Sequence, residues 1–355
     1  MRKRLIGALA MAAVSASLAA CSSSSGGSAD TTAAAAEDGA AAEGEAEGEA
    51  AESADEGEYA SYPERAIEAI IAFDPGGGSD IAARSILSYT EEYLGEPFAI
   101  ENQPGAGGVV GWTAIAHSEP DGYTLGMINL PSIIFNPITM GDQVNYTMDD
   151  FAPIANFVSD PGTFAVLPDS EIQTFEDMIN KAKETPNGLR IAYSGPGTSE
   201  ALTLRRMEQT YGIELREVPF DGTGPMLTAL LGKQVDVMCA NVSEIVGQYE
   251  GGAVKLLAVG AEERIDMVPD VPTYIECGFE QTQVAMRGMA APAGTPDEII
   301  QKLAAAMEQT FNNPEFQEAA ASQNLPLDFL GPEEFQAEID RQEQFYTEQY
   351  AENPW

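Results

Sequence analysis

Side chains that build metal sites and nucleophilic centres are scarce in this sequence. Its 355 residues include one histidine, His117, and three cysteines, Cys21, Cys239 and Cys277. A zinc or iron site with several histidines is therefore excluded, and a Ser-His-Asp or Cys-His catalytic centre would have to use His117. The cysteines show no CxxC spacing, so neither a zinc ribbon nor a disulfide scaffold is indicated. We expect no metal and no cofactor.

Positive charge is also scarce. Only 17 residues are Lys or Arg, whereas 57 are Asp or Glu, and the net charge is −40. Because phosphate backbones are bound by basic patches, this balance argues against a nucleic-acid partner, and it disfavours attraction to anionic lipid headgroups. After residue 20, no apolar run approaches the ~20 residues that cross a bilayer. The length suggests two domains of about 150 residues each.

The N-terminal segment has the pattern of an export signal. Residues 1–20 begin with Arg2, Lys3 and Arg4 and continue as an apolar run to Ala20, which predicts a secretory signal peptide. The run ends in Leu-Ala-Ala-Cys, and this resembles a bacterial lipobox, in which the signal is cut before the cysteine and the thiol is lipidated. We predict a lipid anchor at Cys21 and a location on the outer face of the cell membrane. The alternative is an ordinary signal peptide followed by a chance cysteine.

Residues 21–58 have the composition of a tether. Apart from the cysteine they contain only Ala, Glu, Asp, Gly, Ser and Thr, with 11 acids and no bases. Such a segment has almost nothing to bury, and its like charges repel, so we predict a disordered acidic tether that holds a domain away from the membrane. Residues 59–355 carry 46 acids and 14 bases. Their net charge of −32 makes the predicted folded part strongly acidic as well.

The predicted folded part alternates β-like runs with helical patterns. This alternation indicates βαβ units and a mostly parallel sheet flanked by helices. In four places a predicted strand leads through a glycine-rich loop into a predicted helix. The four loops span 74–80, 102–108, 194–199 and 221–225, and the helices after them are predicted at 81–94, 109–116, 200–211 and 226–231. Ser79 is the predicted N-cap of the first of these helices, and Asp80 favours its first turn.

The glycine-rich loops indicate an anion site. Glycine lets the backbone approach a ligand closely, and a helix N-terminus presents unpaired N–H groups and the positive end of the helix dipole. Four such loops meeting in one cleft would suit a small carboxylate ligand, although any single loop can equally be a tight turn. Two nucleotide-binding motifs are excluded. Residues 105–110 lack the last glycine of the GxGxxG motif, and residues 76–78 lack the Lys-Ser/Thr ending of a P-loop. No GxSxG nucleophile elbow is present, so we do not expect this protein to be an enzyme.

A set of motifs, in a fixed order, closely resembles the substrate-binding proteins of tripartite tricarboxylate transporters, also called the Bug or TctC-like family. The resemblance covers about 59 to 340. Its motifs are YPER (62–65), FDPGGGSD (73–80) with Ala83-Arg84, ENQPGAGG (101–108), PDGYTL (120–125), FAPI (151–154), YSGPGT (193–198), VPFDG (218–222), ALLGKQVD (229–236), VPT (271–273) and APAGTP (291–296).

The resemblance implies a two-lobed α/β periplasmic-binding-protein fold with the ligand between the lobes. Lobe one is expected to comprise 59–155 and 281–355, and lobe two 156–280, with chain crossings near Asn156 and Gln281. It also implies a monomer that captures a small carboxylate, such as a di- or tricarboxylate, for the subunits of a membrane permease. An extracytoplasmic sensor that presents the ligand to a histidine kinase would use the same site. A surface hydrolase is disfavoured by the lone His117.

The expected ligand-binding residues lie in the four loops and at one arginine. They are Asp74, Pro75, Gly76, Gly77, Gly78, Ser79, Asp80, Gln103, Gly105, Ala106, Gly107, Ser194, Gly197, Thr198, Ser199, Asp221, Gly222 and Arg287. Two of them, Asp74 and Asp221, depart from the common family pattern. Either these acids are structural, or the ligand carries an amine or several hydroxyls. Asp221 is expected to be structural, and the role of Asp74 stays open. Arg287 is expected either to pair a ligand carboxylate bidentately or to neutralise a neighbouring acid.

Other conspicuous residues have structural interpretations. Arg84, one turn into the first helix, is expected to form a solvated ion pair. His117 is expected to occupy a favourable position at a helix C-terminus. Cys239 lies in an apolar run and is expected to be buried, and a disulfide between Cys239 and Cys277 stays open, because the sequence gives no geometry. Residues 332–350 are predicted to form an amphipathic surface helix.

Overall fold

The computed structural model describes residues 59–220, 222–352 and 354. The predicted signal peptide, the acidic tether, the lipidation site at Cys21 and the loop residue Asp221 therefore lie outside the described residues. All elements discussed below belong to one compact unit of the chain.

The first sheet is built from strands at both ends of the described chain. Its order is β2 (Phe98–Asn102), β1 (Ile67–Ile71), β3 (Thr124–Leu130), β9 (Val284–Pro292) and β4 (Phe151–Val166), and β10 (Leu327–Leu330) also pairs with β4. The βαβ strands β1, β2 and β3 are mutually parallel, whereas β9 runs antiparallel to both β3 and β4. The sheet is therefore mixed, because β9 returns to it from a distant part of the chain.

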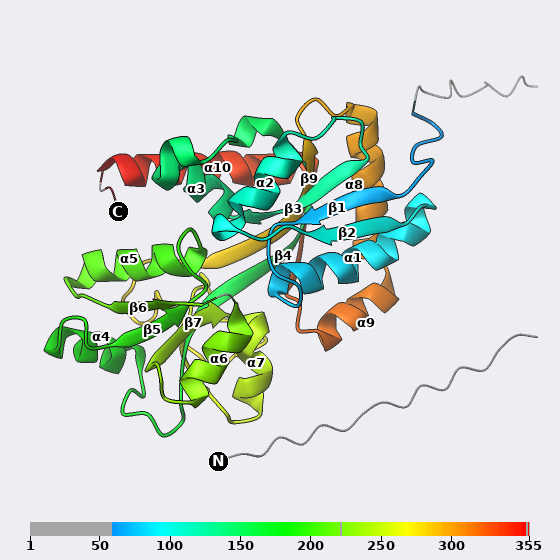
Figure 1. Ribbon diagram of the computed structural model, residues 1–355. Coiled ribbons are helices and arrows are strands. Elements are labelled where there is room, and N and C mark those ends of the chain that lie inside the picture. The colour runs from blue at the N-terminus through cyan, green and yellow to red at the C-terminus, as the bar shows by residue number, and fades with distance from the viewer. Residues whose placement is uncertain (1–58, 221, 353, 355) are drawn as a thin grey trace, which may run out of the picture. The chain divides into compact units, whose positions relative to one another are not determined.

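The second sheet shares β4 with the first. Residues 151–161 of β4 pair with β9, and residues 162–166 pair with β7 (Val237–Asn241) and β8 (Lys255–Val259). Parallel to β7 run β5 (Arg190–Tyr193) and then β6 (Arg216–Pro219). Figure 1 shows β4 and β9 running side by side from the first sheet toward the second. The change of partner at Pro161 and Gly162 makes β4 a continuous link between the sheets.

Helices cover both faces of each sheet. On the first sheet, α1 (Gly78–Leu94), α8 (Asp297–Phe311) and α9 (Pro314–Ser322) share one hydrophobic core, and α2 (Val109–Ala116), α3 (Ser132–Met140) and α10 (Pro332–Glu352) share the other. On the second sheet, α4 (Phe175–Glu184) and α5 (Ser199–Tyr211) pack on one face, and α6 (Thr223–Leu231) and α7 (Val242–Glu250) on the other. Short 3₁₀ turns occur at η1 (Ala106–Gly108), η2 (Gly141–Gln143) and η3 (Met148–Asp150). The core of each sheet is thus sandwiched between two helix layers.

The four predicted strand–loop–helix units all occur, and the predicted α/β class is confirmed. Two local details are wrong. Ser79 does not cap α1, because the helix begins at Gly78 and its N-cap is Gly77, which makes no side-chain cap. The helix α6 begins at Thr223, three residues before its predicted start. Cys239 is fully buried, as predicted. Cys239 and Cys277 are both free thiols, so they form no disulfide with each other. Among the described residues, no helix is both long and apolar enough to cross a bilayer.

Candidate ligand-binding site where the two sheets meet

The first glycine-rich loop is held in place by Asp80. The Asp80 carboxylate accepts a hydrogen bond from the Gly76 amide at 2.8 Å and another from Arg84 at 2.8 Å. Arg84 is about half exposed, so the predicted solvated ion pair is confirmed. Burial acts to raise the pKa of Asp80, but the hydrogen bonds from Gly76 and Asn102 outweigh it, and the pKa lies below its ordinary value. Asp80 therefore stays ionised at the start of α1 and shapes the loop.

The start of α1 lies against side chains from both sheets. A Cβ atom on Gly78 would lie 2.7 Å from Nη2 of Arg287, on β9, and 2.8 Å from Oε1 of Glu244, on α7. Ser79 accepts a hydrogen bond from Nδ2 of Asn129, at the end of β3, at 2.7 Å. Glycine at position 78 is therefore required for Arg287 and Glu244 to reach the N-terminus of α1.

The second and third loops touch each other. Gly107 has a left-handed φ of +66°, and a Cβ atom on it would lie 2.9 Å from the carbonyl oxygen of Pro196. Asn136 of α3 donates a hydrogen bond to the Gly107 carbonyl at 3.0 Å, and a Cβ on Gly197 would collide with the Asn136 side chain. The small residues of these loops thus permit a close backbone approach between the two sheets.

Side chains of the third loop bond mainly to their own segment. Thr198 caps α5, because its hydroxyl accepts a hydrogen bond from the Ala201 amide. The hydroxyls of Ser194 and Ser199 donate to the Glu200 carboxylate at 3.3 and 3.4 Å. Glu200 is only 4% exposed. The residue that follows the third loop, in the first turn of α5, is therefore a buried acid that the sequence motifs do not mark.

The fourth loop contacts Glu244 through the hydroxyl of its threonine. Gly222, with a left-handed φ of +104°, is the N-cap residue of α6. The next residue, Thr223, donates a hydrogen bond to Oε2 of Glu244 at 2.9 Å. Glu244 also accepts from the Asn241 amide at the start of α7. The first and fourth loops are thus both in contact with Glu244.

A buried charge cluster lies where these loops meet. It consists of Asp160, Glu200, Glu244 and Arg287. Arg287 donates to Asp160 at 2.8 Å and lies 3.5 Å from Glu244, and the side chains of Arg287 and Asp160 are 3% and 0% exposed. Asp160 also accepts hydrogen bonds from the amide and hydroxyl of Ser243 at 3.1 and 2.5 Å. In this conformation Arg287 neutralises neighbouring acids, which was one of its two expected roles. Contact with a ligand carboxylate stays a prediction.

The electrostatics of the cluster are unbalanced, since three acids surround one arginine. Burial raises the pKa of Glu244 to about 7; the Arg287 charge acts against this, while the charges of Asp160 and Glu200 add to it. Burial acts to lower the pKa of Arg287, but its acidic neighbours raise it above the ordinary value, so the guanidinium stays charged. The Glu244 carboxyl therefore titrates near neutral pH.

Some buried polar atoms in and beside the cluster have no hydrogen-bond partner in the described chain. Among them are Oδ1 of Asn129 and Nε of Arg287. The two residues are register partners in the antiparallel pairing of β3 with β9, and they are 7% and 3% exposed. An unpaired buried polar group costs free energy. An acceptor and a donor thus stand unsatisfied side by side.

A cavity of about 660 Å³ adjoins the third loop. Phe135, Thr139 and Met140 of α3 line it from the first sheet, and Pro196 and Gly197 line it from the second. It is large enough for a small solute, and it lies beside the contact between the second and third loops.

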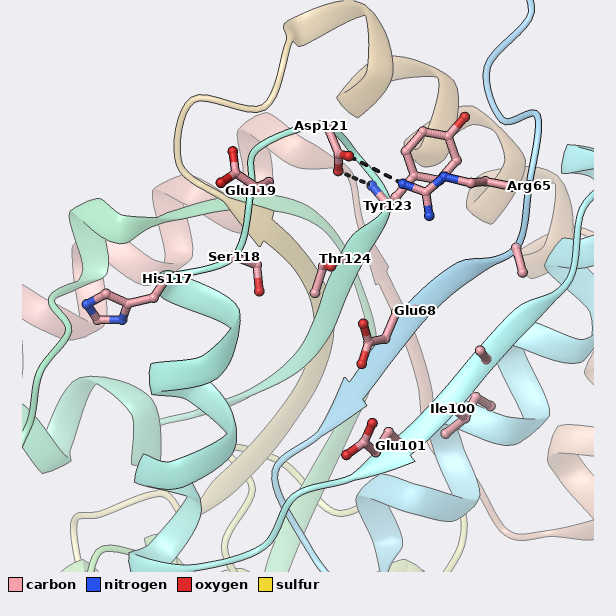
Figure 2. Close-up of a pocket in the computed structure, with 12 residues that line it drawn as sticks. Arg65, Glu68, Ile100, Glu101, His117, Ser118, Glu119, Asp121, Tyr123 and Thr124 are labelled. Atoms are coloured by element: carbon pink, nitrogen blue, oxygen red, sulfur yellow. Dashed lines mark hydrogen bonds and ion pairs between the residues drawn. The ribbon is translucent and has the colours of Figure 1, made fainter.

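A larger hollow of about 770 Å³ lies elsewhere and contains none of the predicted ligand residues. Figure 2 shows that its lining residues come from β1, β2, β3 and the segments beside them, among them Glu68, Glu101 and His117. Here Arg65 pairs with Asp121 and stacks over the ring of Tyr123 at 3.7 Å. His117 is the C-cap residue of α2, the helix C-terminal position predicted for it, and its ring bonds to the Thr113 carbonyl. We assign the candidate site to the glycine-rich loops, because the charged residues there are buried and meet from both sheets.

The sequence motifs identified the loops but missed their partners. Asn129, Asp160, Glu200 and Glu244 stand outside the residues predicted for the site. Asp160, in the interior of β4, is a buried acid in a strand and could have been flagged on that ground. No local sequence pattern distinguishes Glu244 as a site residue, because it forms a capping box at the start of α7, as many surface acids do.

Comparison with known proteins gives a consistent picture. Residues 82–345 match the model of the family described as "Tripartite tricarboxylate transporter family receptor" (TctC). A UPF0065 protein from the gbd 5′ region of Cupriavidus necator is 30% identical, over 77% of this chain and 83% of that protein.

Two solved structures extend the likeness to the fold. The periplasmic binding protein BugD is 30% identical, with a TM-score of 0.74, over 82% of this chain and 98% of BugD. MatC of Rhodopseudomonas palustris, solved with bound malate, is 28% identical, with a TM-score of 0.73, over 81% of this chain and 99% of MatC. The chain therefore belongs to the tripartite tricarboxylate transporter receptor family, whose members are extracytoplasmic substrate-binding receptors of the periplasmic-binding-protein fold and not enzymes.

Proposed function

We propose that this protein captures a small carboxylate, such as a di- or tricarboxylate, outside the cell and delivers it to a tripartite tricarboxylate-type permease. The observation that carries the proposal is the contact of the α1 N-terminus with Arg287, whose Nε has no hydrogen-bond partner among the described residues. Helix N-terminal amides and a guanidinium are both donors that suit a carboxylate. The malate bound to MatC supports the same ligand class.

The site proposed for the ligand comprises the predicted residues of the four loops together with Arg287. The first two loops belong to the first sheet and the last two to the second, and Gly107 approaches Pro196 across the sheets. We take 59–155 with 281–355 as one lobe and 156–280 as the other. Movement of one lobe against the other would then open and close the site, as in other two-lobed receptors.

Isothermal titration calorimetry tests this function directly. The purified folded domain is titrated with a panel of di- and tricarboxylates, aromatic acids and amino acids, and mass spectrometry identifies any solute that co-purifies. We expect at least one carboxylate of the panel to bind. A protein that binds no member and carries no co-purified solute would contradict the proposal.

The lipid anchor is a separate proposal, supported by the sequence around Cys21. Full-length protein expressed in a bacterial host with lipoprotein processing is expected to incorporate radiolabelled palmitate and to fractionate with membranes. The Cys21→Ser variant removes the thiol that would be acylated, so it should lose the label and appear in the soluble extracytoplasmic fraction. Label retained by Cys21→Ser would show that the anchor lies elsewhere.

The proposed receptor is a monomer. Size-exclusion chromatography with light scattering on the folded domain is expected to give the mass of one chain, with and without ligand. A dimer that persists on dilution would contradict this part of the proposal.

A further inference from the structure

The first half of α10 is fixed to the first sheet. Phe335 is fully buried against a glycine of β9, and Ile339, one turn later, is 1% exposed in the same hydrophobic core. Nε2 of Gln342 then donates a weak hydrogen bond to a methionine sulfur on β9 at 3.4 Å. Helix α10 therefore moves with the lobe proposed for 59–155 and 281–355, which we call the first lobe.

The last turns of α10 contact the second lobe (156–280) through one arginine. Arg206, on α5, places its guanidinium carbon 5.0 Å from the ring centre of Phe345 and 5.7 Å from that of Tyr346. Its Nη1 also donates a hydrogen bond to the side chain of Gln281, where the chain returns from the second lobe to the first. The side chain of Arg206 therefore extends from its own lobe onto the first.

This contact can break without leaving a buried charge uncompensated. Burial lowers the pKa of Arg206, and the described chain sets no carboxylate against this effect. Nη2 of Arg206 is buried and has no hydrogen-bond partner among the described residues. A cation over an aromatic ring contributes less energy than the loss of one partner from a buried ion pair costs, and on separation water would hydrate the guanidinium. The contact therefore has the strength of a reversible interaction between the lobes.

The strands that join the two lobes are irregularly paired. On the proposed division, the chain passes between the lobes in β4 and again just before β9, and these strands pair from Phe151 to Pro161. The pairing has register shifts after Pro153 and after Asn156, and such irregularities bend a strand. A contact between helices of the two lobes, α5 and α10, therefore adds a constraint on the angle between them.

Resting on the two-lobed receptor proposed above, we infer that the end of α10 and Arg206 form a latch, which holds the lobes in the arrangement where the glycine-rich loops meet. Arg206 is the part of the latch on the second lobe, and the rings of Phe345 and Tyr346 are the part on the first. In this arrangement Gly107 approaches Pro196 and the latch is formed. The latch favours the closed arrangement only by the energy of its own contact, so it sets how often the empty receptor opens.

Lobe opening is measured on the full chain without a ligand. Nitroxide labels at Ser88→Cys on α1 and Thr228→Cys on α6, two exposed positions on different lobes, give the distance between the lobes by double electron–electron resonance. Cys21→Ser and Cys277→Ser remove two further thiols, and Cys239 is fully buried. We expect this parent protein to show a main distance that belongs to the closed arrangement.

Arg206→Ala removes the second-lobe side of the latch. We expect it to enlarge a population with a longer distance by about threefold, the shift in an equilibrium that loss of one exposed cation–π contact gives. Phe345→Ala should enlarge the same population, and the variant with both changes should not exceed Arg206→Ala alone, because a shared contact is lost only once. If Arg206→Ala is unfolded by circular dichroism, Arg206→Gln, which keeps most of the volume but removes the cation, is held to the same criterion.

Tyr93→Ala is the matched control for Phe345→Ala. The two residues are 38% and 39% exposed, but the hydroxyl of Tyr93 accepts a hydrogen bond from Asn313, in its own lobe. Tyr93→Ala should therefore leave the distances unchanged. Equal distance distributions in the parent protein, Arg206→Ala and Phe345→Ala would overturn the inference, and so would purely additive effects of the two latch variants.

A ligand separates this inference from the proposed function. Malate and succinate are added in turn, at saturating concentration, to labelled Arg206→Ala. A bound carboxylate should restore the short distance, because the ligand and the latch favour the same arrangement. A ligand that binds and lengthens the distance would show that the latch belongs to the open arrangement, which overturns the inference. Binding of neither compound counts against the proposed function, whereas the comparison without ligand still decides the latch.

Discussion

At the scale of single residues, Glu244 gives the empty receptor a pH-dependent stability. Its pKa is about 7 in the folded protein, against an ordinary value of 4.5. Between these values the folded state holds a proton that the unfolded state has released, so raising the pH favours unfolding. This destabilisation is absent below about pH 4.5 and fully present above about pH 7.

We therefore expect Glu244→Gln to become progressively more stable than the wild type as the pH rises through this window. The difference should be on the order of 3 kcal/mol at pH 8. Urea denaturation of both proteins at several pH values between 4.5 and 8 measures it. Glu250→Gln is the control and should follow the wild type throughout. A constant difference between Glu244→Gln and the wild type at all pH values would mean that Glu244 keeps its ordinary pKa.

Comparing two glycines distinguishes the effect of backbone strain from the effect of contact between the loops. Gly107 and Gly95 both have left-handed φ angles, of +66° and +83°. An added Cβ meets Pro196 at position 107, whereas it meets nothing within 4 Å at position 95. Alanine at either position should cost about 1–2 kcal/mol of stability because of the strained backbone. Gly107→Ala should also weaken carboxylate binding by about tenfold, because it pushes the second and third loops apart.

Calorimetry and urea denaturation of the two alanine variants check this pair. The prediction fails if Gly107→Ala binds the carboxylate as well as Gly95→Ala does. In that event the glycine at 107 serves the backbone conformation alone.

At the scale of elements, α10 carries a gradient of burial along its length. Phe335 near its start is fully buried and packs against Gly288 of β9, whereas Phe345 near its end is 39% exposed and lies under the guanidinium of Arg206, 5.0 Å from the ring centre. The helix therefore anchors to the first sheet by its first half and contacts α5 of the second sheet by its last turns.

Truncation of the two phenylalanines should have unequal effects. Phe335→Ala leaves a cavity in the core and should lower the free energy of unfolding by about 3–5 kcal/mol. Phe345→Ala loses mainly the contact with Arg206 and should cost about 1 kcal/mol or less. Urea denaturation monitored by circular dichroism measures both. Equal losses would show that the end of α10 is as firmly packed as its beginning.

At the scale of the whole molecule, the strong negative charge opposes the approach of an anion. Residues 59–355 carry a net charge of −32, so a carboxylate must be held by local donors such as Arg287 and the α1 N-terminus. Salt screens the long-range repulsion more than it screens buried contacts. We expect the affinity for succinate to stay constant or to increase when the salt concentration rises from about 10 mM to about 150 mM, where the Debye length falls from about 30 Å to about 8 Å.

Calorimetric titrations at these two salt concentrations, at constant pH, measure the effect. A loss of affinity of threefold or more would show that exposed cationic side chains dominate the capture of the ligand. Sucrose at matched osmolality is the control for changes that do not depend on charge.

The parts of the fold that could be predicted are those whose causes are local. Apolar runs directly before glycine-rich loops indicated β1 and β5, because burial on both faces of a strand requires such runs. The predicted start of α1 is three residues late. Ser79 has the side chain of an N-cap, but its hydroxyl is held by Asn129, fifty residues away in the chain, and no local pattern records that contact.

The sequence by itself determined the strand–loop–helix units, the acidity of the chain and, through an ordered set of motifs, the family. These follow from neighbouring residues, whose spacing is fixed by covalent geometry. Only the tertiary structure decided what Arg287 meets. Its partner Asp160 is 127 residues away, and the pKa of Glu244 depends on burial by elements of both sheets. Desolvation and charge pairing depend on distances in space, and β4 and β9 must fold together before those distances exist.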